Sequence, residues 1–223
     1  ATQQISDLAI RAGVKNFIYA SSGSVYGIKN EDKVTEDLQL IPLSTYNQTK
    51  MVAERILFSH QDDMKIYCIR PATVCGYSSR MRLDLTVNML TMHALKNKKI
   101  TVLGGNQIRP NIHIQDMVNV YLHFLNNLNL PSGCYNAGFE NLSVLDIAKK
   151  IQKKIPSEII ISKSNDLRSY RLDSSRLISS GFEVKYGIEN AIDEVIQYFN
   201  KGILKDEESF YTVNWMKKLN LES

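Results

Sequence analysis

The sequence predicts an α/β fold made of parallel βαβ units, and two observations lead to this prediction. Short apolar runs alternate along the chain with helix-like segments of about 10–15 residues, the pattern of strands joined by crossover helices. The composition is that of an ordinary globular protein, with 43% hydrophobic and 22% charged residues. A chain of 223 residues is long enough for one large domain or two small ones with a buried core.

The first elements follow from apolar spacing and from turn residues. Ile5, Leu8, Ala9 and Ala12 recur at helical spacing, and Gly13 is a typical residue at a helix end. The segments expected next are a buried strand at 17–20, a Ser/Gly turn at 21–27, a polar loop at 28–44, a helix at 44–59 and a strand at 66–70.

The helix at 44–59 and the strand at 66–70 form the centre of the predicted site region. The residues expected on the inner face of this helix are Thr49, Val52, Ala53, Ile56 and Leu57. Pro71 ends the apolar strand, because proline cannot donate a backbone hydrogen bond to a neighbouring strand.

The rest of the chain continues the alternation of helices and strands. The predicted elements are a helix at 84–97, strands at 100–103 and 112–114, a helix at 115–127, a strand at 134–137, a helix at 143–155, a strand at 158–162, and helices at 173–180 and 188–201. Gly104 and Gly105 form a turn, and the tail at 203–223 is amphipathic without a clear assignment.

Charge and cysteine content exclude several function classes. The net charge of +4 is mild and basic residues occur only in pairs, so no nucleic-acid footprint is expected. Cys68, Cys75 and Cys134 are odd in number and lack metal-ligand spacing, which favours reduced, buried thiols in a cytoplasmic protein and no metal site. No apolar run of about 18 residues is present, so no membrane segment is expected.

Tyr46 and Lys50 form the sharpest local feature. Residues four apart on a helix share one face, and an ammonium group near a phenol stabilises the phenolate, which is then available as an acid or base. The pair alone favours a solvated helix face, because chance gives about one Tyr–Lys pair at this spacing in a chain of this composition. Its context favours chemistry, because the predicted strands at 17–20 and 66–70 end in Ser21–Gly27 and Arg70–Gly76, and ligands of open α/β sheets bind at such carboxyl ends. An ordinary Ser-rich turn is the alternative.

Together these segments resemble the extended short-chain dehydrogenases/reductases, the family of nucleotide-sugar epimerases and dehydratases. The matching segments, in order, are Val14–Ser22, Ser24–Gly27, Tyr46–Lys50, Arg70–Gly76, Gly104–Asp116 and Tyr135–Gly138. Each is weak alone, but their order covers most of the chain to about residue 180. The resemblance implies the C-terminal part of a Rossmann-type parallel sheet with helices on both faces, and a small mixed α/β substrate domain.

The resemblance also implies roles for individual residues. Tyr46 is similar to the catalytic tyrosine, Lys50 to the lysine that holds the cofactor ribose, and Ser22 to the catalytic Ser/Thr. The implied cofactor is NAD, with NADP as an alternative, and the further cofactor contacts are Ala20, Ser21 and Pro71. The implied substrate is a nucleotide sugar, contacted by Ser22, Ser24, Thr73, Asp84, Asn88, Val102, Leu103, Arg109 and Arg168. Arg109 would grip the diphosphate, and Arg171 competes with Arg168 for the second cationic position.

Two departures from the family pattern refine this expectation. Dehydratases of the family carry an Asp-Glu pair where this chain has Gly23 and Ser24, which favours epimerisation or simple oxidoreduction. The Gly-rich phosphate-binding turn is absent from the sequence. We therefore expect the family's first strands, about 90–100 residues, upstream of Ala1, and expect residues 1–223 alone to be inactive.

The predicted organisation is residues 1–77 as the remaining part of the dinucleotide-binding domain, and 78–223 as mainly the substrate domain, with segments crossing back. By the resemblance, the helix at 2–13 and the helix carrying Tyr46 pair with their copies in a homodimer. The predicted function is NAD-dependent epimerisation of a nucleotide sugar. A one-way reductase or dehydrogenase and a non-catalytic dinucleotide-binding relative are the alternatives.

Overall fold

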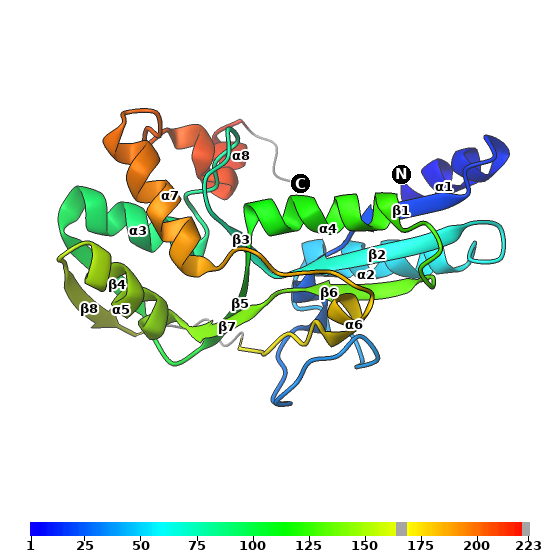
Figure 1. The fold of residues 1–223 in the computed structure, drawn as a ribbon, viewed down its shortest axis with the longest axis horizontal. Helices are drawn as coiled ribbons and strands as arrows, with labels where there is room; N and C mark the ends of the chain where they lie inside the picture. The colour runs from blue at the N-terminus through cyan, green and yellow to red at the C-terminus, as the bar shows by residue number, and fades with distance from the viewer. Residues whose placement is uncertain (164–168, 220–223) are drawn as a thin grey trace.

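The computed structural model describes residues 1–163 and 169–219. Figure 1 shows two lobes, with β1, β2 and β6 in one and β4 and β8 in the other. The helices are α1 (Thr2–Arg11), α2 (Thr45–Phe58), α3 (Thr86–Asn97), α4 (Ile114–Asn126), α5 (Val144–Lys154), α6 (Ser175–Ser179), α7 (Ile188–Asn200) and α8 (Thr212–Lys218), with 3₁₀ turns η1 (Gly23–Tyr26) and η2 (Glu208–Phe210). The strands are β1 (Asn16–Ala20), β2 (Lys65–Pro71), β3 (Thr73–Cys75), β4 (Lys99–Leu103), β5 (Ile108–His113), β6 (Gly133–Ala137), β7 (Glu140–Ser143) and β8 (Glu158–Ser162).

The first lobe contains a parallel sheet in the order β1-β2-β6. One face packs Tyr67, Ile69 and Tyr135 against Phe124 of α4. On the other face, Leu57 of α2 packs with the β2 residues Ile66 and Cys68 and with Cys134 of β6. Helices therefore cover both faces of a parallel sheet, which confirms the predicted α/β class.

The second lobe and its connection to the first contain two smaller sheets. Strands β4 and β8 are parallel, and β3, β5 and β7 form a mixed sheet in which β5 is central. The sequence analysis missed β3 and β7. Each has only three or four residues and no apolar alternation, so each depends on pairing with β5 for its extended conformation.

Segments far along the chain pack in the core of the first lobe. Phe124 of α4, Tyr135 of β6 and Leu177 of α6 join the core that surrounds Tyr26 and Tyr67. A separate core in the second lobe is formed by residues of α3, β4, α5 and α7, including Ile100, Val102, Ile147 and Ile192. The proposed division at residue 78 stays a prediction, since chain order and lobe do not coincide.

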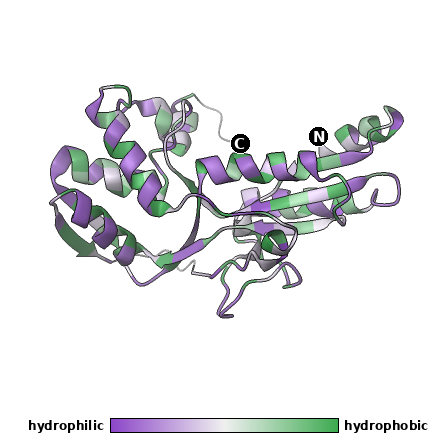
Figure 2. Ribbon diagram, viewed as in Figure 1, coloured by the Kyte–Doolittle hydropathy of each residue, from purple (hydrophilic) through white to green (hydrophobic). Residues whose placement is uncertain are grey.

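The predicted inner face of α2 is partly wrong. Ala53 and Leu57 are buried, but Thr49 and Val52 are exposed, and the charged Glu54 is buried instead. On α1 the apolar Ile5 and Leu8 are also exposed. Figure 2 shows hydrophilic and hydrophobic residues alternating along the helices. The apolar residues of α1 do recur at helical spacing, but Ile5 and Leu8 are not buried within this chain.

The three thiols Cys68, Cys75 and Cys134 are free and buried, as predicted. Throughout the part of the chain that the structure describes, no helix combines the length and apolar character needed to cross a membrane.

Candidate functional site

The carboxyl end of β1 leads directly into the first group of candidate residues. Ser22 is the N-cap of η1, and its Oγ accepts a hydrogen bond from the backbone N–H of Ser24 at 3.2 Å. The hydroxyls of Ser22 and Ser24 lie 2.7 Å apart. The Oγ of Ser24 donates to Oδ1 of Asn47 on α2 at 2.7 Å. Since that bond uses the proton of Ser24, the hydroxyl of Ser22 is the donor between the two serines.

Tyr46 and Lys50 lie one turn apart on the first half of α2, as predicted. Ser44 caps the helix by accepting from the backbone N–H of Asn47 at 3.3 Å. The ring of Tyr46 is 57% exposed, and the ammonium of Lys50 lies 5.6 Å from its centroid. Lys50 also donates to the backbone oxygen of Ala20 at 2.8 Å, and burial lowers the pKa of Lys50. Two contacts therefore join the first half of α2 to the end of β1 and the turn after it: Asn47 accepts from Ser24, and Lys50 donates to Ala20.

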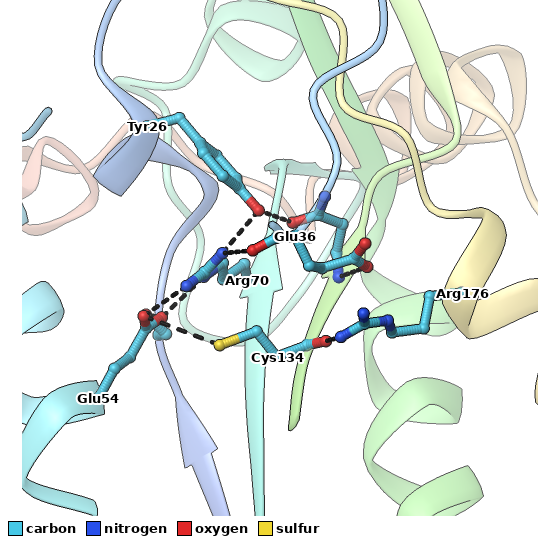
Figure 3. A network of polar contacts seen from close by, with 8 residues as sticks. Tyr26, Glu36, Glu54, Arg70, Cys134 and Arg176 are labelled. Carbon is cyan, nitrogen blue, oxygen red and sulfur yellow. Dashed lines mark hydrogen bonds and ion pairs between the residues drawn. The ribbon is translucent and has the colours of Figure 1, made fainter. Parts of the chain in front are cut away.

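A buried ion pair lies one turn further along α2 (Figure 3). Arg70 of β2 donates to both carboxylate oxygens of Glu54, at 2.9 and 2.7 Å. Ser21 also donates to Glu54, at 2.5 Å. Burial is the largest single influence and acts to lower the pKa of Arg70, but the bond to Glu54 and the interactions with Cys134 and Tyr26 together raise it. The hydroxyl of Ser21 is therefore bound to a buried carboxylate below the end of β1.

The same network continues toward β6. Arg70 donates to the hydroxyl of Tyr26 at 2.7 Å, and Tyr26 donates to Oδ1 of Asn136 at 2.8 Å (Figure 3). Burial, partly offset by Arg70, raises the pKa of Tyr26 to about 12. The amide of Asn136 donates to the backbone oxygens of Val34 and Asp173, at 2.9 Å each. The loop between η1 and α2 is thereby fixed to the sheet.

A cavity of about 320 Å³ opens beside Ser24 and extends between the lobes. This volume lies at the lower end of the range for small-molecule sites. Its lining includes five of the residues proposed from the sequence to contact substrate: Ser24, Thr73, Asp84, Leu103 and Arg109. Thr73 is on β3 and Arg109 is on the adjacent strand β5. Asp84 is held by a two-pronged pair with Arg82, at 2.6 and 3.0 Å.

Other candidates lie away from this cavity. Asn88 is buried, where its amide accepts from the backbone N–H of Gly76 and donates to the oxygen of Arg82. Val102 is fully buried in the core of the second lobe. Pro71 is the last residue of β2 and pairs with Ala137 of β6. Arg168 lies outside the described residues, and the backbone oxygen of Arg171 accepts from Val34.

Gly23 follows Ser22 at a position with little room for a side chain. A Cβ atom there would lie 3.1 Å from the backbone oxygen of Pro71 and 3.5 Å from Leu172. The first distance is tighter than an ordinary contact, and its partner is backbone that cannot rotate away. The packing around η1 therefore opposes an acidic residue at this position.

Sequence reasoning missed several residues of this region. Glu54 carries a detectable signal, because it continues the i, i+4 row of Tyr46 and Lys50 on the side of Ala53 and Leu57. Asn47 and Asn136 carry no such signal, since their partners are distant in sequence. The cavity-lining Met89, Thr101 and Tyr170 likewise gather only through folding.

Comparison with known proteins places these features in a family. Residues 1–138 match the model of the NAD dependent epimerase/dehydratase family. An uncharacterised UDP-glucose epimerase of Bacillus subtilis (strain 168) is 31% identical over 154 residues, which is 68% of this chain and 48% of that protein. A UDP-glucose 4-epimerase of Lactobacillus helveticus is 28% identical over 210 residues, 83% of this chain and 63% of that protein.

Solved structures agree with this placement. A UDP-glucuronic acid 4-epimerase from Bacillus cereus in complex with NAD superposes with a TM-score of 0.79 at 26% identity, covering 91% of this chain and 67% of that one. The chain spans about half to two thirds of the length of the two curated relatives above. Over more than half of its own length, its sequence matches one family, and its parallel sheet and Tyr46–Lys50 helix fit the same assignment. The chain belongs to the NAD dependent epimerase/dehydratase family, whose members are enzymes of the extended short-chain dehydrogenase/reductase type.

Proposed function

We propose that the protein acts as an NAD-dependent epimerase on a nucleotide-activated sugar. The observation that carries this proposal is the placement of Lys50 against Ala20 at the end of β1, one helical turn from Tyr46 and next to the segment of Ser22 and Ser24. Ser24 lines a cavity that Arg109 also lines. A binding module has no need of a hydroxyl, a phenol and an ammonium group at one point. The relatives named as UDP-glucose epimerases support the same substrate class.

The chain's own residues have distinct roles in this proposal. Tyr46, as phenolate, takes the proton from a sugar hydroxyl, and Lys50 stabilises the phenolate through its positive charge. Ser22 hydrogen-bonds the same sugar oxygen. To donate to that oxygen, the Ser22 hydroxyl must turn away from Ser24, its acceptor in this structure. Arg109 binds the diphosphate while the sugar turns over between the two half-reactions.

NAD would supply the hydride acceptor and donor for the sugar carbon, with Lys50 holding its nicotinamide ribose. The described residues suit one end of this cofactor. Lys50 is a donor for the ribose hydroxyls, and the exposed ring of Tyr46 is open to a ligand. The 223 residues contain no Gly-rich turn of the kind that binds a dinucleotide pyrophosphate. The fit therefore concerns the nicotinamide-ribose end.

Gly23 supports epimerisation over dehydration. Elimination of water from the sugar needs an additional acid beside the catalytic hydroxyl, and the resemblance places the family's acidic pair at Gly23 and Ser24. The close approach of Pro71 disfavours a side chain at position 23, and Ser24 donates its proton to Asn47. Neither position supplies an acid.

A reductase or dehydrogenase that works in one direction is the second candidate. The matched relatives include anthocyanidin reductases, which shows that the family's site also serves reduction. The two proposals differ in what happens to the cofactor. An epimerase ends each cycle with its cofactor in the starting redox state, whereas a reductase consumes one reduced cofactor per product.

The test is to incubate the full-length protein with a panel of UDP- and dTDP-sugars and NAD, and to follow product identity together with absorbance at about 340 nm. We expect interconversion of two epimers without net formation of NADH. The Tyr46→Phe variant is the control for contaminating activity. Stoichiometric oxidation or reduction of the cofactor would assign the second candidate, and no turnover of any nucleotide sugar would contradict both.

We further propose that the protein is a cytoplasmic homodimer. Ile5 and Leu8 on α1 are exposed, and so is Val52 on α2, which lines a groove between the start of α1 and α2 together with Thr49 and Ile56. Exposed apolar surface shared by two helices is typical of subunit contacts.

A further inference from the structure

The buried pair of Glu54 and Arg70 takes part in no step of the proposed reaction. The two residues are only 3% and 4% exposed, and their side chains meet through two hydrogen bonds (Figure 3). A buried ion pair is weak evidence for stability, because removing two charges from water is costly. Its presence directly below the site therefore calls for an explanation in terms of the site.

Glu54 connects the segments that carry the candidate catalytic residues. It lies one turn after Lys50 on α2, and it accepts a hydrogen bond from Ser21, the residue before Ser22. Its ion-pair partner Arg70 immediately precedes Pro71 at the end of β2. One carboxylate thus joins α2 to the ends of both central strands.

We propose that Glu54 and Arg70 are positioning residues of the active site, which hold α2 against the ends of β1 and β2 and leave Lys50 as the net charge beside Tyr46. This inference rests on the proposed role of Tyr46 as a phenolate. The pair has two parts to its role. The hydrogen bonds of the pair fix the positions of Lys50 and Ser22. Because the charges of Glu54 and Arg70 cancel, Lys50 is the main source of electrostatic potential at Tyr46.

The surroundings of Tyr46 support the second part. The titratable groups that interact electrostatically with it or with its neighbours are Tyr19 of β1, Tyr121 of α4 and Cys68 of β2. Burial raises the pKa of each of these groups, with the bond to Cys134 as the largest cause for Cys68, so all are neutral near pH 7. Among the described groups that these interactions identify, charge near Tyr46 comes from Lys50 and from the Glu54–Arg70 pair.

Substituting one partner of the ion pair leaves the other charge uncompensated, which shifts the pH dependence of the reaction. In Glu54→Gln, Arg70 stays charged because a guanidinium does not lose its proton in proteins. The uncompensated positive charge favours the Tyr46 phenolate, so the acidic limb of the kcat/KM–pH profile moves to lower pH. Eight residues of helix separate Tyr46 from Glu54, about 12 Å. At an effective dielectric constant of about 20, a unit charge at that distance shifts the limb by at most about one pH unit, and salt screening reduces the shift because Tyr46 is exposed, so the profiles are compared at low ionic strength.

Three further variants separate positioning from simple stability. Glu54→Gln/Arg70→Gln restores neutrality, so the acidic limb returns to its wild-type position even though the ion pair is lost. Glu54→Asp keeps the charge but shortens the side chain, so the limb stays in place while kcat falls about tenfold, the loss of a charged hydrogen bond. Asp206→Asn removes one partner of the Lys96–Asp206 ion pair in the second lobe, and we expect no shift of the limb.

A spectroscopic readout keeps this test independent of the substrate. Carbon-13 NMR of tyrosine ring carbons, with Tyr46→Phe to assign the signal, follows the ionisation of Tyr46 directly in the full-length protein. We expect its midpoint to fall in Glu54→Gln and to recover in the double variant. An unchanged midpoint in Glu54→Gln, or wild-type kcat in Glu54→Asp, would overturn the inference. Absence of turnover with every nucleotide sugar, with the midpoint shift present, would contradict the proposed function alone.

Discussion

The site combines two regions that are built differently. At the rim formed by β1, β2 and α2, a short hydrogen-bonded chain links the candidate side chains, from Ser22 through Ser24 to Asn47, the residue next to Tyr46. At the cavity wall of the second lobe, the lining is dispersed over α3, β4 and β5. The rim holds the candidate reacting groups in fixed positions, whereas the cavity wall offers a surface for the substrate to bind. We therefore expect substitutions at the rim to change turnover and substitutions at the wall to change affinity.

The largest expected effect is at the rim. Tyr46→Phe keeps the ring and removes the acid/base hydroxyl, so kcat should fall by about 10²–10⁴-fold, the usual contribution of general acid/base catalysis. Steady-state kinetics of the full-length protein measure this effect. Tyr121→Phe, which removes a hydroxyl from the neighbouring helix α4, is the matched control and should retain most activity. Turnover of Tyr46→Phe within a few-fold of wild type would remove Tyr46 from the mechanism.

The second prediction concerns the cofactor and residues 1–223 as an isolated chain. Dinucleotides are bound chiefly by backbone N–H groups of a Gly-rich turn and the helix behind it, and the sequence has no such turn. Lys50 and Tyr46 reach only the nicotinamide-ribose end, so we expect a Kd for NAD above about 1 mM, which corresponds to roughly 4 kcal/mol of binding free energy. Calorimetry on the folded chain measures it. Micromolar binding would show that the rim alone holds the cofactor.

The third prediction moves to the cavity wall. Arg109→Ala removes a charged donor that lines the cavity, and we expect the affinity for a nucleotide sugar to fall about 10- to 100-fold with a smaller change in kcat. Lys99→Ala, at the start of β4 in the same lobe, is a control for loss of a cation at an exposed position. Equal losses in kcat and affinity would place Arg109 with the rim residues and remove the distinction between the two regions.

The positions of the rim residues follow from the local sequence more directly than those of the wall residues, for a physical reason. Tyr46 and Lys50 are one helical turn apart, and Ser22 directly follows a strand, so local geometry alone brings each to the edge of the sheet. The wall depends on how separate elements pack. Asn88 and Val102 were predicted to contact substrate, yet the packing of α3 and β4 turns both into the interior, whereas Leu103, one residue further along β4, lines the cavity.

The same reasoning explains which parts of the fold were predicted. Long periodic segments such as 44–59 and 188–201 were located correctly, because their apolar spacing is a property of the segment itself. The strands β3 and β7 were missed because they are extended only through β5. Apolar spacing also misled on α1 and α2, where Ile5, Leu8 and Val52 are exposed in this chain.

The fourth prediction tests the hydrogen-bonded chain within the rim. Asn47→Ala removes the acceptor for Ser24, so the hydroxyl of Ser22 is less well oriented, and kcat should fall about 2- to 10-fold, the effect of one neutral hydrogen bond. KM should change little, since Asn47 is buried and does not line the cavity. Asn47→Asp retains an acceptor oxygen and is the control, which we expect to be closer to wild type. A change confined to KM would show that Asn47 acts on binding instead.

The smallest effect on turnover is expected away from both regions, on the outer face of α1 and α2. Leu8 on α1 is 60% exposed, and Val52 on α2, which lines the groove between the start of α1 and α2, is 47% exposed. Leu8→Glu introduces a charge that would have to be desolvated in a subunit contact, so we expect sedimentation at micromolar concentration to show a dimer for the wild type and a monomer for the variant. Leu125→Glu, at an equally exposed apolar position on α4, is the matched control and should remain dimeric. Because Leu8 lies on α1, outside the rim and the cavity lining, kcat should change less than in the three preceding kinetic tests, at Tyr46, Arg109 and Asn47. A monomeric wild type, or a Leu8→Glu variant that still dimerises, would contradict the assignment of this face as the subunit contact.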